Sequence, residues 1–397
     1  MNPNSRVKVT VYGQVNRAVQ FSFDKHNTEV QHVDNDGSSS RLGFLAQGRV
    51  DPDLAISGRI EVEWQNNRRS ATHDRAVGNT RLRSRHVDLW TDHKDLGQLW
   101  LGHGGLAGGA ANVKTLSGTS YVFGFGGPGL DSGILATGKD GHSKYARHTF
   151  LTFTGARANR IMYVTPNVMG FRASVSHSDK DQISAGLDYA GNPFGMKNVR
   201  AVMGFGWTRL PGDGATFPGG AGKPTVIVNP AGTAPAVRPA MRVPGGGADA
   251  QAYAVSGGIM HVPTGLNISA SWAVRDHQRD GTPAKPTPDD AKAFGVEVGW
   301  TGSIWGMGAT SVSVGYGRWE NEEGPAGPAG RTAAMGRYHE GHSERYHVAV
   351  VQNIDPAASD VYFGVSYDDG KSMHHGTKKL MEREAIVSIV TGIRIKF

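Results

Sequence analysis

The sequence predicts an all-β fold, a transmembrane antiparallel β-barrel of sixteen strands, and three observations support it. Apolar and polar residues alternate along many segments, the connections between these segments are short and long in turn, and glycine supplies 56 of the 397 residues, roughly twice the usual share. No run of about 18 apolar residues could form a transmembrane helix. A barrel does not need such a run, because its lipid-facing residues alternate with lumen-facing ones.

The first segment, RVKVTVYGQVNRAVQFSF (residues 6–23), is a long strand with two different faces. Valine and phenylalanine occupy most odd positions, and polar residues such as Lys8, Thr10 and Gln14 occupy the even ones. Strands of soluble sheets rarely exceed about 10 residues. The length of this strand therefore indicates a thick apolar layer, and a bilayer meets that requirement.

The next two segments form a hairpin. Leu42, Phe44 and Val50 share one face of residues 41–50, and the pattern resumes over residues 54–65 after Asp51-Pro52-Asp53. Two strands joined by so short a turn are antiparallel. The remaining strands predicted by the same alternation cover residues 80–92, 97–104, 158–166, 170–178, 182–190, 199–209, 251–262, 265–276, 291–302, 308–319, 343–354, 359–368 and 384–397.

The connections differ in length in a regular way. Six are short turns, at residues 51–53, 92–96, 166–169, 263–264, 302–306 and 355–359. Between them lie mostly long loops, at residues 25–39, 66–79, 105–157, 210–250, 277–290, 320–342 and 369–383. This organisation is typical of an outer-membrane barrel with short periplasmic turns and long extracellular loops. Residues 178–182 and 191–198 depart from it, which leaves the register of one strand there open.

Tryptophans support the same orientation. Five of them lie near strand ends, where an aromatic girdle is expected at the membrane interfaces: Trp64, Trp90, Trp207, Trp272 and Trp300. No signal-peptide pattern precedes Asn2, so we expect the export signal to have been removed.

Composition limits the chemistry. Cysteine is absent, which excludes disulfides, thiol catalysis and thiolate metal sites. The net charge of +7 favours anionic partners such as lipopolysaccharide phosphates or anions in transit. No run of five or six basic residues indicates a nucleic-acid-binding arm, so no nucleic-acid partner is expected.

Five stretches in order resemble the general diffusion porins of Gram-negative bacteria, from one end of the chain to the other. They are VTVYGQVN (Val9 to Asn16), SSRLGF (Ser39 to Phe44), RHVDLWTDHKDLGQLWLGH (Arg85 to His103), RANRIMYVTPNVMGFRASVSHS (Arg157 to Ser178) and the terminal TGIRIKF (Thr391 to Phe397). The resemblance implies one barrel domain over residues 1–397, a homotrimer in the outer membrane, and no enzymatic activity. It also implies that the third long loop, residues 105–157, folds into the lumen as a constriction. The Pro/Ala/Gly-rich loop 210–250 departs from the family pattern.

The resemblance further implies that basic residues on the wall face acids on the third loop. By position, the basic candidates are Arg41, Arg59, Arg83, Arg85, Arg157 and Arg160, and the acidic ones are Asp131 and Asp140, diluted by Lys139 and Lys144. A mostly basic constriction would enrich anions. Strand parity places Arg83 and Arg85 on the Val87 and Leu89 face, so either a β-bulge or a position above the membrane is required.

The remaining motifs give little evidence for a ligand or metal site. GFGGPG (residues 124–129) has the letters of a dinucleotide fingerprint but lacks a βαβ unit. His339, His342, His374 and His375 are loop histidines without a carboxylate at ligand spacing, so no metal site and no cofactor are expected. Calcium at Glu320, Glu322 and Glu323 is an alternative that the resemblance allows.

The sequence thus predicts a porin for passive diffusion of small hydrophilic solutes and ions, with anions preferred. Two alternatives stay open, a substrate-selective channel with saturable block and a plugged barrel acting as an adhesin or enzyme through loops 210–250 and 320–342. A soluble all-β protein would differ from all three by staying in solution without detergent.

Overall fold

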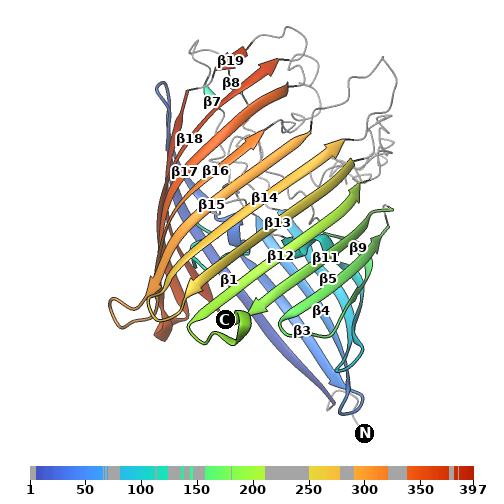
Figure 1. Ribbon diagram of the computed structural model, residues 1–397. Helices are drawn as coiled ribbons and strands as arrows, with labels where there is room; N and C mark the ends of the chain where they lie inside the picture. Colours follow the sequence, from blue (N-terminus) through green and yellow to red (C-terminus); the bar gives the residue numbers. More distant parts are fainter. Residues whose placement is uncertain are drawn as a thin grey trace, which may run out of the picture.

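The computed structural model is a closed antiparallel barrel (Figure 1). The structure describes residues 6–65, 67, 69, 81–111, 114–123, 136–137, 144–145, 157–179, 181–210, 250–277, 290–320, 338–374, 380–382 and 384–397. Sixteen strands form the wall: β1 (Val7–Phe23), β3 (Arg41–Arg49), β4 (Leu54–Gln65), β5 (Arg81–His93), β6 (Gly97–Gly105), β9 (Arg157–Val164), β10 (Phe171–Ser178), β11 (Ile183–Gly191), β12 (Val199–Leu210), β13 (Ala250–His261), β14 (Leu266–His277), β15 (Ala291–Gly302), β16 (Thr310–Glu320), β17 (Tyr338–Ile354), β18 (Ser359–His374) and β20 (Ile386–Lys396).

Short additional elements flank this wall. β2 (Thr28–Asp34) pairs with β1, and β19 (Leu380–Glu382) pairs with β18, which makes the sheet 18-stranded in all. β7 (Ala136–Thr137) and β8 (Lys144–Tyr145) form a separate two-stranded sheet. The 3-10 turns are η2 (Asp36–Ser38), η4 (Ala107–Ala111), η5 (Pro193–Gly195) and η6 (Asp355–Ala357). Among the described residues, no helix is long and apolar enough to cross a bilayer.

Neighbouring strands along the chain pair with each other, and β1 closes the ring. Its first half pairs with β3 from Val7 to Gln14, and its second half pairs with β20 from Gln14 to Phe23. The sixteen predicted strands are therefore confirmed. The strands β10, β11 and β12 also pair where predicted, so the irregularity around residues 178–182 and 191–198 lies in the lengths of the connections and not in the register.

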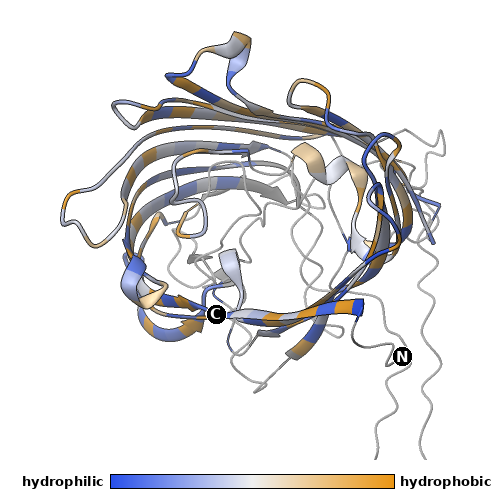
Figure 2. Cartoon of the chain, turned by 90° about the horizontal axis from the view of Figure 1, so that it is seen from below, coloured by the Kyte–Doolittle hydropathy of each residue, from blue (hydrophilic) through white to orange (hydrophobic). Residues whose placement is uncertain are grey.

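The two faces of the wall differ as the alternation predicts. Large apolar side chains such as Val9, Ile60 and Leu101 are more than half exposed on the outside, as a surface in contact with lipid requires. On the inside, the buried residues are mostly small or polar, such as Ser184 and Ser313. Viewed from below, Figure 2 shows the ring of strands with hydrophilic and hydrophobic residues alternating along them.

The tryptophans only partly follow the predicted girdle. Trp64 and Trp272 are exposed on the outer face. Trp90 directly follows Leu89, which is exposed on the outer face, so its side chain lies on the inner face of β5, where it stacks on Trp100 of β6. The girdle prediction for Trp90 is therefore wrong. Its strand-end position suggested an interface residue, whereas the twofold period of the strand places its side chain in the lumen.

Candidate functional site

The six predicted arginines lie on one continuous part of the wall. Arg41 is on β3, Arg59 on β4, Arg83 and Arg85 on β5, and Arg157 and Arg160 on β9. These strands are neighbours in the order β3-β4-β5-β6-β9. We call this part of the barrel the arginine wall, and it contains two ion-pair networks and one arginine outside them.

The first network is centred on Asp88 of β5. Arg59 donates from Nε and Nη2 to the two carboxylate oxygens of Asp88 at 3.1 and 3.0 Å. Arg160 donates from Nη2 to Asp88 Oδ2 at 3.1 Å, and its other donors reach the carbonyl oxygens of Gly102 and Gly105. The Asp88 side chain is fully buried and that of Arg160 nearly so. One carboxylate therefore holds two guanidinium groups.

A glycine makes this network possible. Arg160 must cross strand β6 to reach Asp88, and Gly104 of β6 lies in its path. A Cβ at Gly104 would stand 2.6 Å from Asp88 Oδ2 and 2.7 Å from Arg160 Nη2, closer than any ordinary contact. The absence of a side chain there lets one ion-pair network span four strands.

The second network involves Glu61 and Glu63 of β4. Arg85 donates from Nε to Glu61 Oε1 at 2.5 Å and from Nη1 to Glu63 Oε2 at 3.0 Å. Arg41 Nη1 lies 3.9 Å from Glu61 Oε1, and Arg83 Nε lies 3.9 Å from Glu63 Oε1. Both carboxylates are buried, so the arginines that hold them are fixed in place.

A β-bulge directs Arg85 inward. Glu61 pairs with His86 and Val62 pairs with Ser84, so Arg85 is the extra residue between two registers. The bulge reverses which positions of β5 face inward, so on its N-terminal side Arg83 pairs with the inward-facing Glu63. The bulge that strand parity required is confirmed, and its consequence is that both arginines face the lumen.

Arg157 stands apart from both networks. It is the first residue of β9 and is exposed, and its charge interacts with those of Arg85, Glu61 and Glu63. Within the described part of the chain, no carboxylate lies at ion-pair distance from it. Arg157 therefore contributes charge near the second network without belonging to either one.

The third loop lies inside the barrel, and it begins on the strands that follow the arginine wall. Its turn η4 packs against β11 and β12 at three glycines. Cβ atoms at Gly186, Gly204 and Gly206 would stand 1.9 to 2.2 Å from carbonyl oxygens of η4. The amide of Ala107 donates to Ser176 Oγ at 3.0 Å, and that of Gly108 donates to Ser184 Oγ at 2.6 Å. Small wall residues thus provide the seat for the loop.

The following residues of the loop continue along β13 to β16. The amide of Lys114 donates to Ser256 Oγ at 3.0 Å, Thr115 donates to Glu297 at 3.2 Å, and Thr119 shares a 2.7 Å hydrogen bond with Ser313. The Lys114 ammonium also forms an ion pair with Asp188. The predicted inward fold of the third loop is confirmed for these residues.

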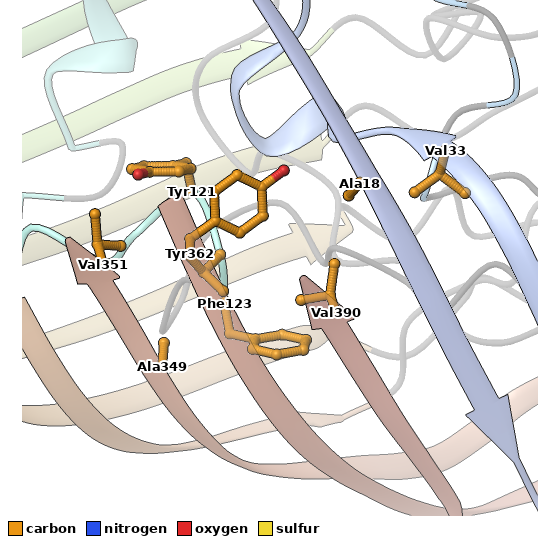
Figure 3. Close-up of a cluster of buried hydrophobic side chains, with 9 residues drawn as sticks. Ala18, Val33, Tyr121, Phe123, Ala349, Val351, Tyr362 and Val390 are labelled. Atoms are coloured by element: carbon orange, nitrogen blue, oxygen red, sulfur yellow. The ribbon is translucent and has the colours of Figure 1, made fainter. Parts of the chain in front are cut away.

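The loop then reaches an apolar cluster. Tyr121, Val122 and Phe123 pack against residues of β1, β2, β17, β18 and β20, as Figure 3 shows; these are Ala18, Val33, Ala349, Val351, Tyr362 and Val390. Arg69 donates to the carbonyl oxygen of Val122 at 2.5 Å. Burial raises the pKa of the Tyr121 hydroxyl, and the Arg394 guanidinium 3.8 Å from its ring partly opposes the shift.

The positions of the predicted acids on the third loop stay a prediction. Asp131, Asp140 and Lys139 lie outside the described residues, as does the side chain of Lys144. The carboxylates that meet the arginines are instead Glu61, Glu63 and Asp88, on the wall itself. Strand alternation already places them on the same face as Arg59, so the pattern of β4 and β5 could have identified them.

Metal binding finds no support in what is described. Glu320 forms an ion pair with Arg318 at 2.8 Å, while Glu322, Glu323, His375 and the side chains of His339 and His374 lie outside the described residues. Among the residues that are described, no group of three or more potential ligands is placed to hold a metal ion. Calcium binding stays a prediction from the sequence.

Comparison with known proteins agrees with this geometry. The family model for Gram-negative porins matches residues 4–374, while no curated protein matches the chain. The anion-selective porin from Comamonas acidovorans has a TM-score of 0.56 at 16% identity, covering 98% of this chain and 100% of that chain. The trimer form of OmpT, an outer membrane protein of Vibrio cholerae, has a TM-score of 0.56 at 14% identity, covering 98% and 99%.

The outer membrane channel DcaP of Acinetobacter baumannii is similar in the same way, with a TM-score of 0.55 at 12% identity, covering 100% of this chain and 99% of that one. At such identities these structures show a shared fold. The family match, which spans nearly the whole chain, shows more. The chain belongs to the Gram-negative porin family and is an integral β-barrel channel of the outer membrane.

Proposed function

We propose that this channel is a homotrimer for passive diffusion of small hydrophilic solutes and ions, that it prefers anions, and that it needs no cofactor and catalyses no reaction. The observation that carries the anion preference is the imbalance of the arginine wall. Six arginines, at 41, 59, 83, 85, 157 and 160, share this wall with the buried carboxylates Glu61, Glu63 and Asp88. The excess charge is positive.

The position of this charge makes it effective. A charge on the wall of a water-filled lumen is surrounded by protein and lipid of low dielectric constant, which focuses its field into the water. Rings of Arg and Lys in pores favour anions for that reason. The buried carboxylates fix the arginines against the wall, and Arg157 adds a charge that has no carboxylate at ion-pair distance among the described residues.

Two relatives support the proposal by their own properties. The similar porin from Comamonas acidovorans is anion-selective, and the similar OmpT of Vibrio cholerae has a trimer form. The net charge of +7 also makes lipopolysaccharide phosphates suitable partners for the rim of the barrel.

The experiment is ion-current recording in a planar bilayer under a KCl gradient. We expect conductance steps in groups of three and a reversal potential that favours chloride. Steps with potassium preferred would overturn the anion preference and leave the channel. Saturable block by one solute class would favour the substrate-selective channel, and no conductance from folded protein would favour a barrel that acts through its outer loops.

The variant Arg157→Gln tests the role of the wall. One unit charge acting over about 9 Å of water is worth about 0.5 kcal/mol, which lowers the permeability to chloride about twofold and raises that to potassium about twofold, so we expect the ratio of chloride to potassium permeability to fall about fourfold. The matched control is Arg49→Gln, because Arg49 is exposed beside the turn after β3 and donates to the carbonyl oxygen of Pro52. An equal effect of the two variants would contradict a local role for Arg157.

A further inference from the structure

Two tryptophans stack against each other on the lumen side of the arginine wall. Trp90 of β5 and Trp100 of β6 are paired in register, and their ring centroids are 4.1 Å apart with an interplanar angle of 13°. Their neighbours Leu89, Leu99 and Leu101 are about half exposed on the lipid side. The alternation of the strands therefore directs both indoles into the channel.

Fixed cations border this indole pair. The guanidinium carbon of Arg59 lies 5.9 Å from the centroids of both Trp90 and Trp100, and that of Arg160 lies 5.8 Å from Trp100. Asp88 holds both arginines in these positions. A single carboxylate shared by two guanidinium groups leaves a positive charge beside the rings.

The residues that pair with the two tryptophans from the neighbouring strands are uncharged. In the register of the sheet, Ser57 of β4 lies beside Trp90, and Met162 of β9 lies beside Trp100. Both indoles are only partly buried, so they present apolar aromatic surface to the lumen. A flat apolar surface next to a fixed cation is complementary to a solute that is both planar and anionic.

We propose that Trp90, Trp100, Arg59 and Arg160 form a subsite for planar aromatic anions, such as aromatic carboxylates, during their passage. The inference rests on the proposed function as an anion-preferring channel. The ring of the solute packs against the indole pair, and its carboxylate interacts with the partly exposed guanidinium of Arg59, while the buried Arg160 contributes its charge at longer range. A non-aromatic carboxylate of the same charge and similar size retains only the second interaction.

The test compares benzoate with cyclohexanecarboxylate as blockers of the KCl current. An aromatic contact of the usual strength corresponds to a roughly 3- to 10-fold lower concentration of benzoate for half block. In Trp100→Leu we expect this difference to disappear while the chloride preference stays. The matched control Trp272→Leu, on the lipid face where Trp272 is 47% exposed, should keep the difference.

The outcomes separate this inference from the function on which it rests. A chloride-preferring wild-type channel that both acids block equally would overturn the subsite and leave the channel. Equal loss of benzoate block in Trp100→Leu and Trp272→Leu would also overturn it.

A second measurement does not depend on current. Saturation-transfer NMR on the detergent-solubilised trimer should show stronger transfer to benzoate than to cyclohexanecarboxylate. This measurement tests binding at the subsite even if the channel does not conduct or Trp100→Leu does not fold. Equal transfer to the two acids would overturn the proposal.

Discussion

The two sides of the lumen are built from the same alternating strands but carry different side chains. The arginine wall on β3 to β9 presents long charged residues that pair with one another through Glu61, Glu63 and Asp88. The other wall on β11 to β16 presents glycine and serine, on which the third loop lies. The charged groups of the arginine wall form ion pairs with one another, whereas serines of the other wall form hydrogen bonds with the third loop.

This difference shows how one barrel can hold a loop at one side and an open charged surface at the other. Close packing of a loop needs wall residues that are small and offer single hydrogen bonds. A charged surface that faces water needs long side chains whose positions are fixed by neighbours. The following substitutions test each half of the comparison.

The largest effect is expected from Asp88→Asn. The change removes the only carboxylate shared by Arg59 and Arg160 in the described part of the wall and leaves two largely buried guanidinium groups without it. Breaking a buried ion pair costs about 3–5 kcal/mol, so the midpoint of denaturant unfolding in detergent should fall strongly. Asp92→Asn, at an exposed position of the same strand, is the control. If both variants unfold alike, the arginine wall does not depend on this network.

A smaller effect is expected from Gly206→Ala. The new Cβ would stand 2.0 Å from the carbonyl oxygen of Gly108, so η4 must move away from β12. Overpacking of this kind costs about 1–3 kcal/mol, and displacement of the loop should also change the unit conductance. Gly105→Ala introduces the same methyl group where nothing lies within 4 Å and should leave conductance unchanged. An unaltered conductance in Gly206→Ala would mean that this seat does not position the loop.

The smallest effect is expected from Ser256→Ala. Ser256 Oγ accepts from the amide of Lys114 and donates to the carbonyl oxygen of Ala111, and such hydrogen bonds contribute about 0.5–1.5 kcal/mol each. We expect a slightly lower unfolding midpoint and more current noise from the loop. Ser174→Ala, a buried serine on the same face of β10, is the comparison. Equal effects would indicate that the loop gains nothing specific from Ser256.

Most of the barrel could be predicted from the sequence, because the twofold period of a strand is local information. The inward direction of Arg85 could be predicted only as a requirement for a bulge. The position of Trp90 near a strand end predicts an interface residue, whereas its parity on β5 directs it into the lumen. The seat of the third loop was not predictable, since it depends on Gly204 and Gly206 meeting a turn about a hundred residues earlier in the chain.

The partners of the arginines show the same limit. The resemblance predicts acids on the third loop, Asp131 and Asp140, which lie outside the described residues, and the carboxylates described beside the arginines are Glu61, Glu63 and Asp88 on β4 and β5. Their alternation with apolar residues fixes the face on which they lie, whereas the choice of partner depends on the bulge at Arg85 and the gap at Gly104. The bulge and the gap both depend on how neighbouring strands pair, which the sequence of a single strand does not show.

The pairing of β1 with β20 also has a consequence for the order of assembly. Gly13 and Phe397 exchange two backbone hydrogen bonds, of 2.8 and 3.1 Å, across the seam that closes the barrel. These residues stand near opposite ends of the chain, so the seam joins segments that are very far apart in the sequence. Contacts between such distant residues form slowly, since the entropy of ordering the whole chain must be lost before they contribute. We therefore expect closure to be a late step of folding, and until it occurs the edges of β1 and β20 are open to pairing with other chains.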